Sequence, residues 1–153
     1  DWKKVASSLE NIADSALFRK AKQLNMRYAS IYNGTEETAE NAEKEWQKLD
    51  TFTRYSNISA ADFNDVQRSI LACENQGLTV DTMSAKWFET MSELEHIRWC
   101  RYHYLNNWKY GKPEKGTKDK AKRIHAALVP YSSLSESEKD KDRENIRILF
   151  SLD

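Results

Sequence analysis

Three side chains that often bind metal ions follow one another at helical spacing: His96, Cys100 and His103. On a helix the outer two lie about 10.5 Å apart along the axis, which is too far for both to bind one ion. No carboxylate joins a neighbouring pair at a suitable spacing, so we expect no metal site. Cys100 would need an oriented histidine and an oxyanion pocket to act as a nucleophile, and the sequence indicates neither. We therefore expect no catalytic residues and no enzyme.

A second kind of chemistry is the recognition of a flat ligand. The same succession of a polar residue, an arginine and an aromatic ring occurs in Asn25-x-Arg27-Tyr28 and in His96-x-Arg98-Trp99. Two rings can hold a heterocycle between them, and each stack contributes roughly 1–3 kcal/mol. The polar residue can hydrogen-bond the ligand edge, and arginine binds phosphate through two parallel hydrogen bonds. The alternative is that both rings only close a packed interface.

A lysine-rich segment, residues 109–123, offers further contacts to phosphate. The chain of 153 residues nevertheless has 24 basic and 24 acidic residues, whereas proteins that bind long nucleic acids carry a basic excess. We expect this segment to be a solvated flap or a phosphate clamp, and we expect no long nucleic acid as partner. No apolar run approaches the roughly 20 residues of a membrane-spanning helix. Two cysteines without a secretion signal are typical of a cytoplasmic protein.

Long helices must position these residues, because only four glycines and two prolines interrupt the chain. Apolar periodicity predicts helices over residues 14–32, 58–71 and 84–106. An extended piece is expected over 124–131, since the residue before a proline avoids the helical region. Ser135 begins a capping box that opens the last helix.

The longest of these helices has an unusual pattern. Its His96 and His103 fall opposite the apolar stripe, and Trp99 lies between the two faces. Arg98 within the stripe is either buried with a partner or extends its charged end to water. The stripe is predicted to consist of Trp87, Met91, Leu94, Arg98, Tyr102 and Leu105.

An internal repeat relates the two ends of the chain. Trp46-x-x-Leu49-Asp50 and Tyr131-x-x-Leu134-Ser135 share a pattern, and each ends in a residue that can cap the following helix. In this register Asn57 corresponds to Asp142, and upstream Asn25 corresponds to His96. We infer that the chain duplicates one helical unit, which the lysine-rich segment enlarges in the second copy.

The second copy carries a series of specific motifs: E-H-x-R-W from Glu95, W-K-Y-G from Trp108, K-x-x-H-x-x-L-V-P-Y from Lys122 and E-K-x-x-D-R from Glu138. This succession resembles the ryanodine receptor repeat (RyR) domain family over residues 90–152. Ser56-Asn57 with Ala60-Ala61-Asp62 resembles the degenerate first half of bacterial members. The sequence departs from the family pattern at Ala126, often a proline, and at Glu114 and Lys115, which replace an acidic pair.

The resemblance implies a mainly α fold in which two pseudo-twofold related helical repeats form a single domain over residues 1–153. The degenerate first repeat is expected over 12–77. The second repeat, over 83–152, is expected to contain a long loop and a short extended segment.

The functional hypothesis is a non-enzymatic, ligand-sensing or regulatory module of a larger cytoplasmic bacterial protein, fused to other domains. We expect it to bind a small nucleotide-type ligand in a cleft between the two repeats, without a cofactor or metal. The alternative is a scaffold or protein-interaction domain with no small-molecule ligand. The expected ligand-binding residues are Asn25, Arg27, Tyr28, His96, Arg98, Trp99, Trp108, Tyr110 and His125.

Overall fold

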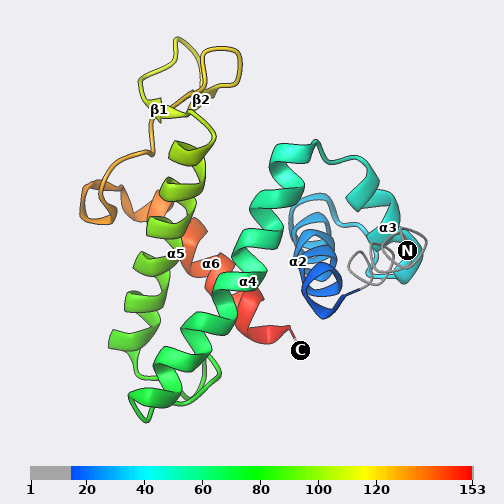
Figure 1. The fold of residues 1–153 in the computed structure, drawn as a ribbon, viewed down its shortest axis with the longest axis vertical. Helices are drawn as coiled ribbons and strands as arrows, with labels where there is room; N and C mark the ends of the chain where they lie inside the picture. The colour runs from blue at the N-terminus through cyan, green and yellow to red at the C-terminus, as the bar shows by residue number, and fades with distance from the viewer. Residues whose placement is uncertain (1–14, 153) are drawn as a thin grey trace, which may run out of the picture. The chain divides into compact units, whose positions relative to one another are not determined.

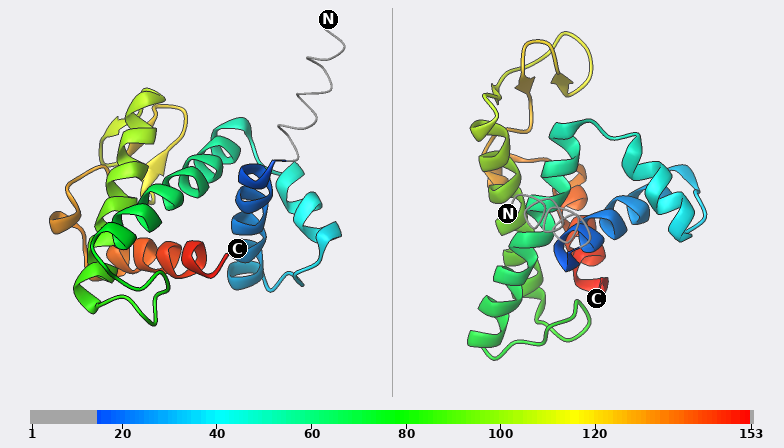
Figure 2. Two further views of the ribbon diagram at one scale, coloured as in Figure 1. Left: turned by 60° about the horizontal axis from the view of Figure 1, so that its bottom comes forward. Right: turned by 45° about the vertical axis from the view of Figure 1, so that its right-hand side comes forward.

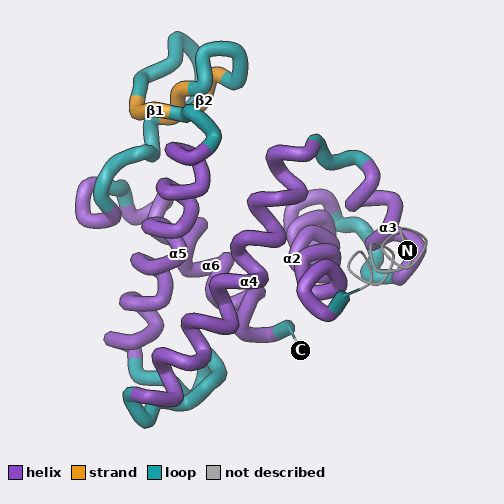
Figure 3. Tube along the Cα trace, viewed as in Figure 1, coloured by secondary structure: helices purple, strands orange, loops and turns teal. Residues whose placement is uncertain are grey.

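The structure is a computed structural model, and it describes residues 15–152. It is mainly helical, with a small three-stranded sheet (Figures 1 and 3), which confirms the predicted fold class. The helices are α2 (Ala16–Asn33), α3 (Ala39–Gln47), α4 (Thr51–Cys73), α5 (Ala85–Leu105), the 3₁₀ helix η1 (Tyr131–Ser133) and α6 (Glu136–Ser151). The strands are β1 (Lys109–Tyr110), β2 (Lys118–Asp119) and β3 (Ile124–His125). The predicted starts of the first helix and of the first repeat lie outside the described residues.

Within residues 15–152, no helix combines the length and the apolar composition that crossing a bilayer requires. These residues divide into two compact units, the first formed by residues 15–65 and 151–152 and the second by residues 66–150. The single domain and the repeat boundaries stay predictions.

The first unit is built from α2, α3 and the first part of α4. Ser15 begins α2 by accepting a hydrogen bond from the Phe18 amide at 3.4 Å, and Gly34 ends it in the left-handed region, with φ of 67°. Asp50 begins α4 in the same way, because its carboxylate accepts from the Thr53 amide at 2.8 Å. The core of this unit consists of Ala21, Trp46 and Ala61, with Leu17, Leu49 and Ile58 packed against them.

The second unit is built from the end of α4, from α5 and α6, and from the segment between them. Figures 1 and 2 show α6 crossing α5, with the small sheet beyond the C-terminal end of α5. Parallel pairing of β1 with β3 and antiparallel pairing of β2 with β3 give the strand order β1-β3-β2. The predicted extended segment therefore begins as a strand at Ile124. The core consists of Leu71, Met83, Met91, Ile146 and Phe150.

The predicted apolar stripe of α5 is wrong for part of its length. Leu105 is 84% exposed, whereas His96 and His103 are only 3% and 5% exposed. The histidines are buried because polar groups of other segments hydrogen-bond them or aromatic rings pack on them. Periodicity alone counts such residues as solvent-facing. Arg98 is buried with a partner, which was one of the two expected arrangements.

Candidate functional site

All three histidines of the chain surround one indole ring, that of Trp99. The ring of His103 packs at a centroid distance of 4.0 Å, and that of His96 lies at 5.7 Å. The ring of His125 meets the indole edge-on at 4.8 Å. His96 and His103 flank Trp99 on α5, one turn away on either side, while His125 comes from β3. Pairing with β1 and β2 holds β3, and so His125, at the C-terminal end of α5.

Trp99 also lines a cavity of about 310 Å³ within the second unit. The indole is half-buried, so part of it remains accessible. The cavity walls come from α5, from β2 and β3 with the residues beside them, from the residue after η1, and from α6. The lining residues are His96, Trp99, Thr117, Lys118, His125, Ala127, Leu134, Glu138, Lys141, Asp142 and Asn145.

His96 is held by hydrogen bonds at both ring nitrogens. Nδ1 lies 3.1 Å from a carboxylate oxygen of Asp142, and Nε2 lies 2.8 Å from the carbonyl oxygen of Val129. Burial lowers the pKa of His96, but the bonds to Asp142, to the Cys100 thiol and to Val129 outweigh it and raise the pKa to about 10. His96 is therefore an imidazolium at neutral pH and donates from both nitrogens.

Asp142 is the counterion of this imidazolium. Burial raises the pKa of its carboxyl group, and the hydrogen bond from His96 opposes that rise. The His96 and Asp142 side chains are only 4% and 10% exposed, so water screens their attraction little. The pair links α5 to α6, and both of its residues line the cavity.

Cys100, His96 and Asp142 follow one another in the order of a nucleophile, a base and an orienting carboxylate. The Cys100 sulfur lies 3.3 Å from His96 Nε2, so the structure supplies the orienting group that the sequence did not indicate. Catalysis needs more than this order. His96 Nε2 donates its proton to Val129, and Cys100 is buried and does not line the cavity. Cys100, His96 and Asp142 thus form a chain of contacts inside the second unit.

His125 and His103, unlike His96, are neutral at neutral pH. Burial, followed by the neighbouring His103 and Lys118, lowers the pKa of His125 to about 4. Its Nδ1 accepts from the Ala127 amide at 3.0 Å, so the proton of the neutral ring is on Nε2. Burial also lowers the pKa of His103, whose Nδ1 lies 2.9 Å from the Trp99 carbonyl oxygen. Two neutral imidazoles therefore contact the indole.

Two lysines stand at the cavity from different elements. Lys118 comes from β2, and Lys141 comes from α6, where its ammonium group lies 2.7 Å from a Glu138 carboxylate oxygen. The Lys141 side chain is 62% exposed, so this ion pair is weak and can exchange. Together with the His96 imidazolium, the lysines outnumber the carboxylates of Glu138 and Asp142. The cavity therefore has a positive balance.

Of the predicted ligand-binding residues, His96, Trp99 and His125 line this cavity. Trp108 is buried and does not line the cavity, and its ring lies 5.2 Å from that of His103. Tyr110 is 50% exposed on β1. The Arg98 guanidinium makes two hydrogen bonds of 2.8 Å to Glu95, whose side chain is 1% exposed, so this charge is held within the protein.

The other three predicted residues belong to the first unit. Asn25 is buried and accepts a hydrogen bond from the Asn57 amide at 3.5 Å. Arg27 lies 3.4 Å from Glu37. Tyr28 is half-buried, and its ring lies 6.3 Å from that of Tyr32. A cleft between the repeats with Tyr28 and Trp99 facing it stays a prediction.

The sequence did not predict that residues of α6, or Thr117 and Lys118 at β2, line a site. Asp142 had a signal, because it belongs to the E-K-x-x-D-R motif and corresponds to Asn57 in the repeat. Lys118 is one of several lysines in the lysine-rich segment, and the sequence does not distinguish it from the others. Glu138 begins the same motif, whereas nothing in the spacing of Lys141 and Asn145 separates a cavity wall from the solvated face of a helix.

Comparisons with known proteins give one family. A family model described as RyR domain matches residues 72–151. The match covers the whole of α5, the sheet and α6, and therefore every residue that lines the cavity at Trp99. A comparison with curated proteins finds no match.

Proposed function

The chain belongs to the RyR domain family, and from this premise we propose that it is a ligand-sensing module of a larger cytoplasmic bacterial protein. The proposed ligand is a small nucleotide-type molecule, and the proposed site is the cavity beside Trp99. The observation that carries the proposal is the meeting of one accessible indole with two lysines around a cavity of about 310 Å³. This volume lies at the lower end of the range for small-molecule sites.

Trp99 supplies the contact for a flat heterocycle. His103 and His125 hold the indole in place, so little side-chain freedom remains to be lost on binding. Stacking of a base on such a ring contributes roughly 1–3 kcal/mol. The Nε2 proton of neutral His125 and the amide of Asn145 are polar groups at the same cavity, suited to the polar edge of a base.

Lys118 and Lys141 supply the contacts for phosphate. Each is exposed, so its ammonium group is hydrated and reaches the ligand without an initial cost of burial. Phosphate competes with Glu138 for Lys141, and release of Glu138 leaves a carboxylate for a ribose hydroxyl. The arrangement therefore favours a phosphorylated ligand over a free base.

We propose binding without catalysis, and therefore no enzymatic role. His96, which has the strongest proton affinity of the three histidines, donates both ring protons to protein groups. Neither proton is available for transfer to a ligand. Binding is then read out by whatever domains are fused to the module.

The test is titration of the protein with AMP, ADP, ATP and cyclic AMP, followed by calorimetry and by tryptophan fluorescence. At least one of these nucleotides should bind, and Lys118→Ala with Lys141→Ala should weaken its binding at least tenfold. The matched control is Lys86→Ala with Lys109→Ala, which removes two exposed lysines of the second unit that lie away from the cavity.

Two results would contradict the proposal. One is the absence of any response to all four nucleotides, which favours the protein-interaction function. The other is an equal loss of affinity in the control variant, which would point to general charge attraction. Native mass spectrometry of protein purified from its host then identifies a ligand that is retained.

A further inference from the structure

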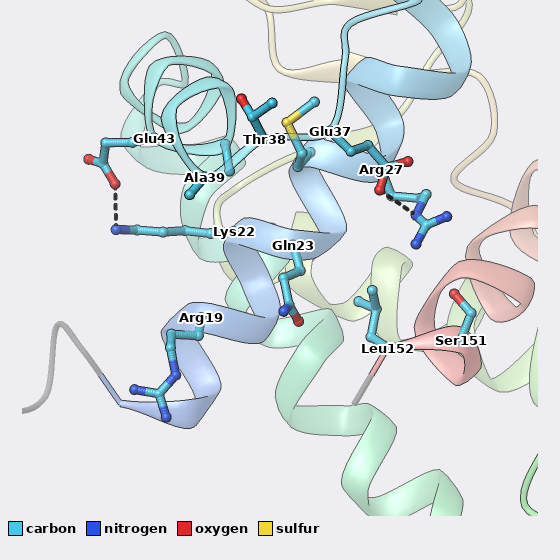
Figure 4. Close-up of a pocket in the computed structure, with 12 residues that line it drawn as sticks. Arg19, Lys22, Gln23, Arg27, Glu37, Thr38, Ala39, Glu43, Ser151 and Leu152 are labelled. Carbon is cyan, nitrogen blue, oxygen red and sulfur yellow. Dashed lines mark hydrogen bonds and ion pairs between the residues drawn. The ribbon is translucent and has the colours of Figure 1, made fainter.

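A second cavity lies in the first unit and is separate from the one at Trp99. Its volume is about 480 Å³, and its walls come from α2, from the start of α3 and the residues just before it, and from the last residue of α6 with Leu152 (Figure 4). The side chains of Gln23, Arg27 and Leu152 lie around the same space, whereas Lys22 extends away from it toward Glu43.

Arg27 leaves a polar group of this cavity unsatisfied. Its Nε is buried, and among the described residues no acceptor hydrogen-bonds to it. The nearest carboxylate oxygen, on Glu37, lies 3.4 Å from Nε, beyond the usual length of such a bond. A buried donor without an acceptor carries the full cost of losing its water. A ligand oxygen placed beside Nε would remove that cost.

The pair of Arg27 and Glu37 can yield to such a ligand. Both side chains are 41% exposed, so their attraction is screened by water and contributes little. Lys22, in contrast, is held by Glu43 at 2.7 Å, and the hydrogen bond from Lys22 lowers the pKa of the Glu43 carboxyl group. Arg27, unlike Lys22, therefore has a carboxylate partner beyond the usual hydrogen-bond distance, which a ligand can replace more easily.

Part of the remaining wall is apolar, beside the polar residues Gln23, Thr38 and Ser151. Met26 and Leu152 are 5% and 7% exposed, and Ala39 and Ala42 of α3 line the same cavity. Inorganic phosphate has no apolar group that could cover these side chains. An anion that carries an apolar group would cover it and gain the free energy of removing it from water.

We propose that this cavity binds a small organic anion, with its carboxylate or phosphate oxygens on Arg27 and its apolar group against Met26 and Leu152. The guanidinium fork offers two parallel donors to such a group. The N-terminal end of α3 faces the same space and adds a favourable dipole. The proposal does not depend on the site at Trp99, since the two cavities share no residue.

The experiment is a titration of ¹⁵N-labelled protein with benzoate, acetate and benzyl alcohol, followed by NMR. Benzoate should move the side-chain Nε resonance of Arg27 and the amide resonance of Leu152. Acetate, which lacks the ring, and benzyl alcohol, which lacks the charge, should each bind at least tenfold more weakly.

Two variants separate binding from folding. Arg27→Gln should weaken benzoate at least tenfold, while Lys48→Ala, which removes an exposed cation outside the cavity, should leave it unchanged. Ala42→Leu fills the cavity and keeps Arg27, so it should also abolish binding. The proposal is overturned if benzyl alcohol binds as well as benzoate, if benzoate moves no resonance at the cavity, or if Ala42→Leu binds as the native protein does.

Discussion

His96 and Asp142 form a buried ion pair, with His96 Nδ1 3.1 Å from Asp142 Oδ2, and this pair joins α5 to α6 beneath Trp99. The pair matters more for the arrangement of α5 and α6 than for the net stability of the protein. Removing two charges from water costs nearly as much as their attraction returns, so a buried pair adds little net stability. Removing one partner is costly, because the other remains buried and charged. The pair therefore fixes the orientation of the two helices that form the cavity.

Asp142→Asn should lower the free energy of unfolding by about 3 kcal/mol at neutral pH, because His96 loses its counterion. The pKa of His96 is raised from 6.5 to about 10 in the native protein. The stability that this shift contributes is complete below pH 6.5 and is lost as the pH rises toward 10. Urea unfolding should therefore show the difference between variant and native protein narrowing over that range.

Asp140→Asn is the matched control, since Asp140 is on the same helix and its ion pair with Arg143 is 65% exposed on the Asp140 side. It should change the free energy of unfolding by less than about 1 kcal/mol. Equal losses for the two variants, or a difference that does not depend on pH, would contradict a charged His96.

The helices of this fold could be predicted from sequence because local signals mark them. Ser84 accepts from the Trp87 amide at 3.3 Å and begins α5 at the predicted place, and Ser135 accepts from the Glu138 amide at 3.3 Å and begins α6. The capping residue Asp50 was recognised in the repeat, yet the predicted second helix began too late, since Thr51–Ile58 lacks a clear apolar period.

The cavity could be predicted only in part, because its walls come from segments that are far apart in the chain. His96, Trp99 and His125 carry family motifs and were found. The buried face of α5 was not predicted, because the groups that cover His96 and His103 (the Val129 carbonyl, Asp142 and the Trp108 ring) come from other segments. Lys118 and Lys141 are ordinary surface lysines in sequence, and only the fold brings them to one cavity.

Acid should destabilise the protein through His125. Its pKa is lowered from 6.5 to about 4, so between these values the unfolded chain binds a proton that the native ring does not. The free energy of unfolding should therefore fall by about 3 kcal/mol as the pH decreases from 7 to 4. His125→Asn keeps an acceptor for the Ala127 amide and removes the titration, so its urea unfolding should depend less on pH in this range. An unchanged pH dependence in the variant would mean that another group is responsible.

Glu89 should stabilise the second unit through Arg143 of α6. The guanidinium makes hydrogen bonds of 2.9 Å and 2.8 Å to Glu89, which also accepts from the Tyr131 hydroxyl at 2.8 Å. Glu89→Gln should cost about 1 kcal/mol, a modest value because the Glu89 side chain is 43% exposed. Glu144→Gln removes an ion pair with Arg147 whose side chains are 35% and 49% exposed, and serves as control, with an expected cost below about 0.5 kcal/mol in thermal unfolding.

Trp99→Leu should weaken the binding of any responding nucleotide by roughly tenfold, as expected from loss of a stack of about 1–3 kcal/mol. Trp87→Leu is the matched control, because Trp87 is half-buried against the core of the same unit and does not line the cavity. Both variants should lower the melting temperature, so affinity measured by calorimetry below that temperature separates them. Equal affinities would mean that Trp99 is a packing residue only.

The pair of Asn25 and Asn57 in the first unit tests the proposed duplication. Asn57 donates to Asn25 at 3.5 Å, and the corresponding residues of the second unit, Asp142 and His96, are also paired, although there His96 is the donor. Other corresponding contacts agree, because Arg54 lies 6.0 Å from the ring centre of Trp46 and Lys139 lies 5.5 Å from that of Tyr131. If the units are copies, a histidine and an aspartate should fit at positions 25 and 57, in place of the two asparagines.

Asn57→Asp alone buries a carboxylate without a counterion and should lower the free energy of unfolding by about 3 kcal/mol. Adding Asn25→His should recover at least about 1.5 kcal/mol of that loss, because the histidine can protonate and pair with the new carboxylate. Asn25→His alone places a large polar ring beside Asn57 and completes the double-mutant cycle in urea unfolding. Additive losses would show that the two positions do not meet as His96 and Asp142 do, and that the matching motifs of the two units arose without a common geometry.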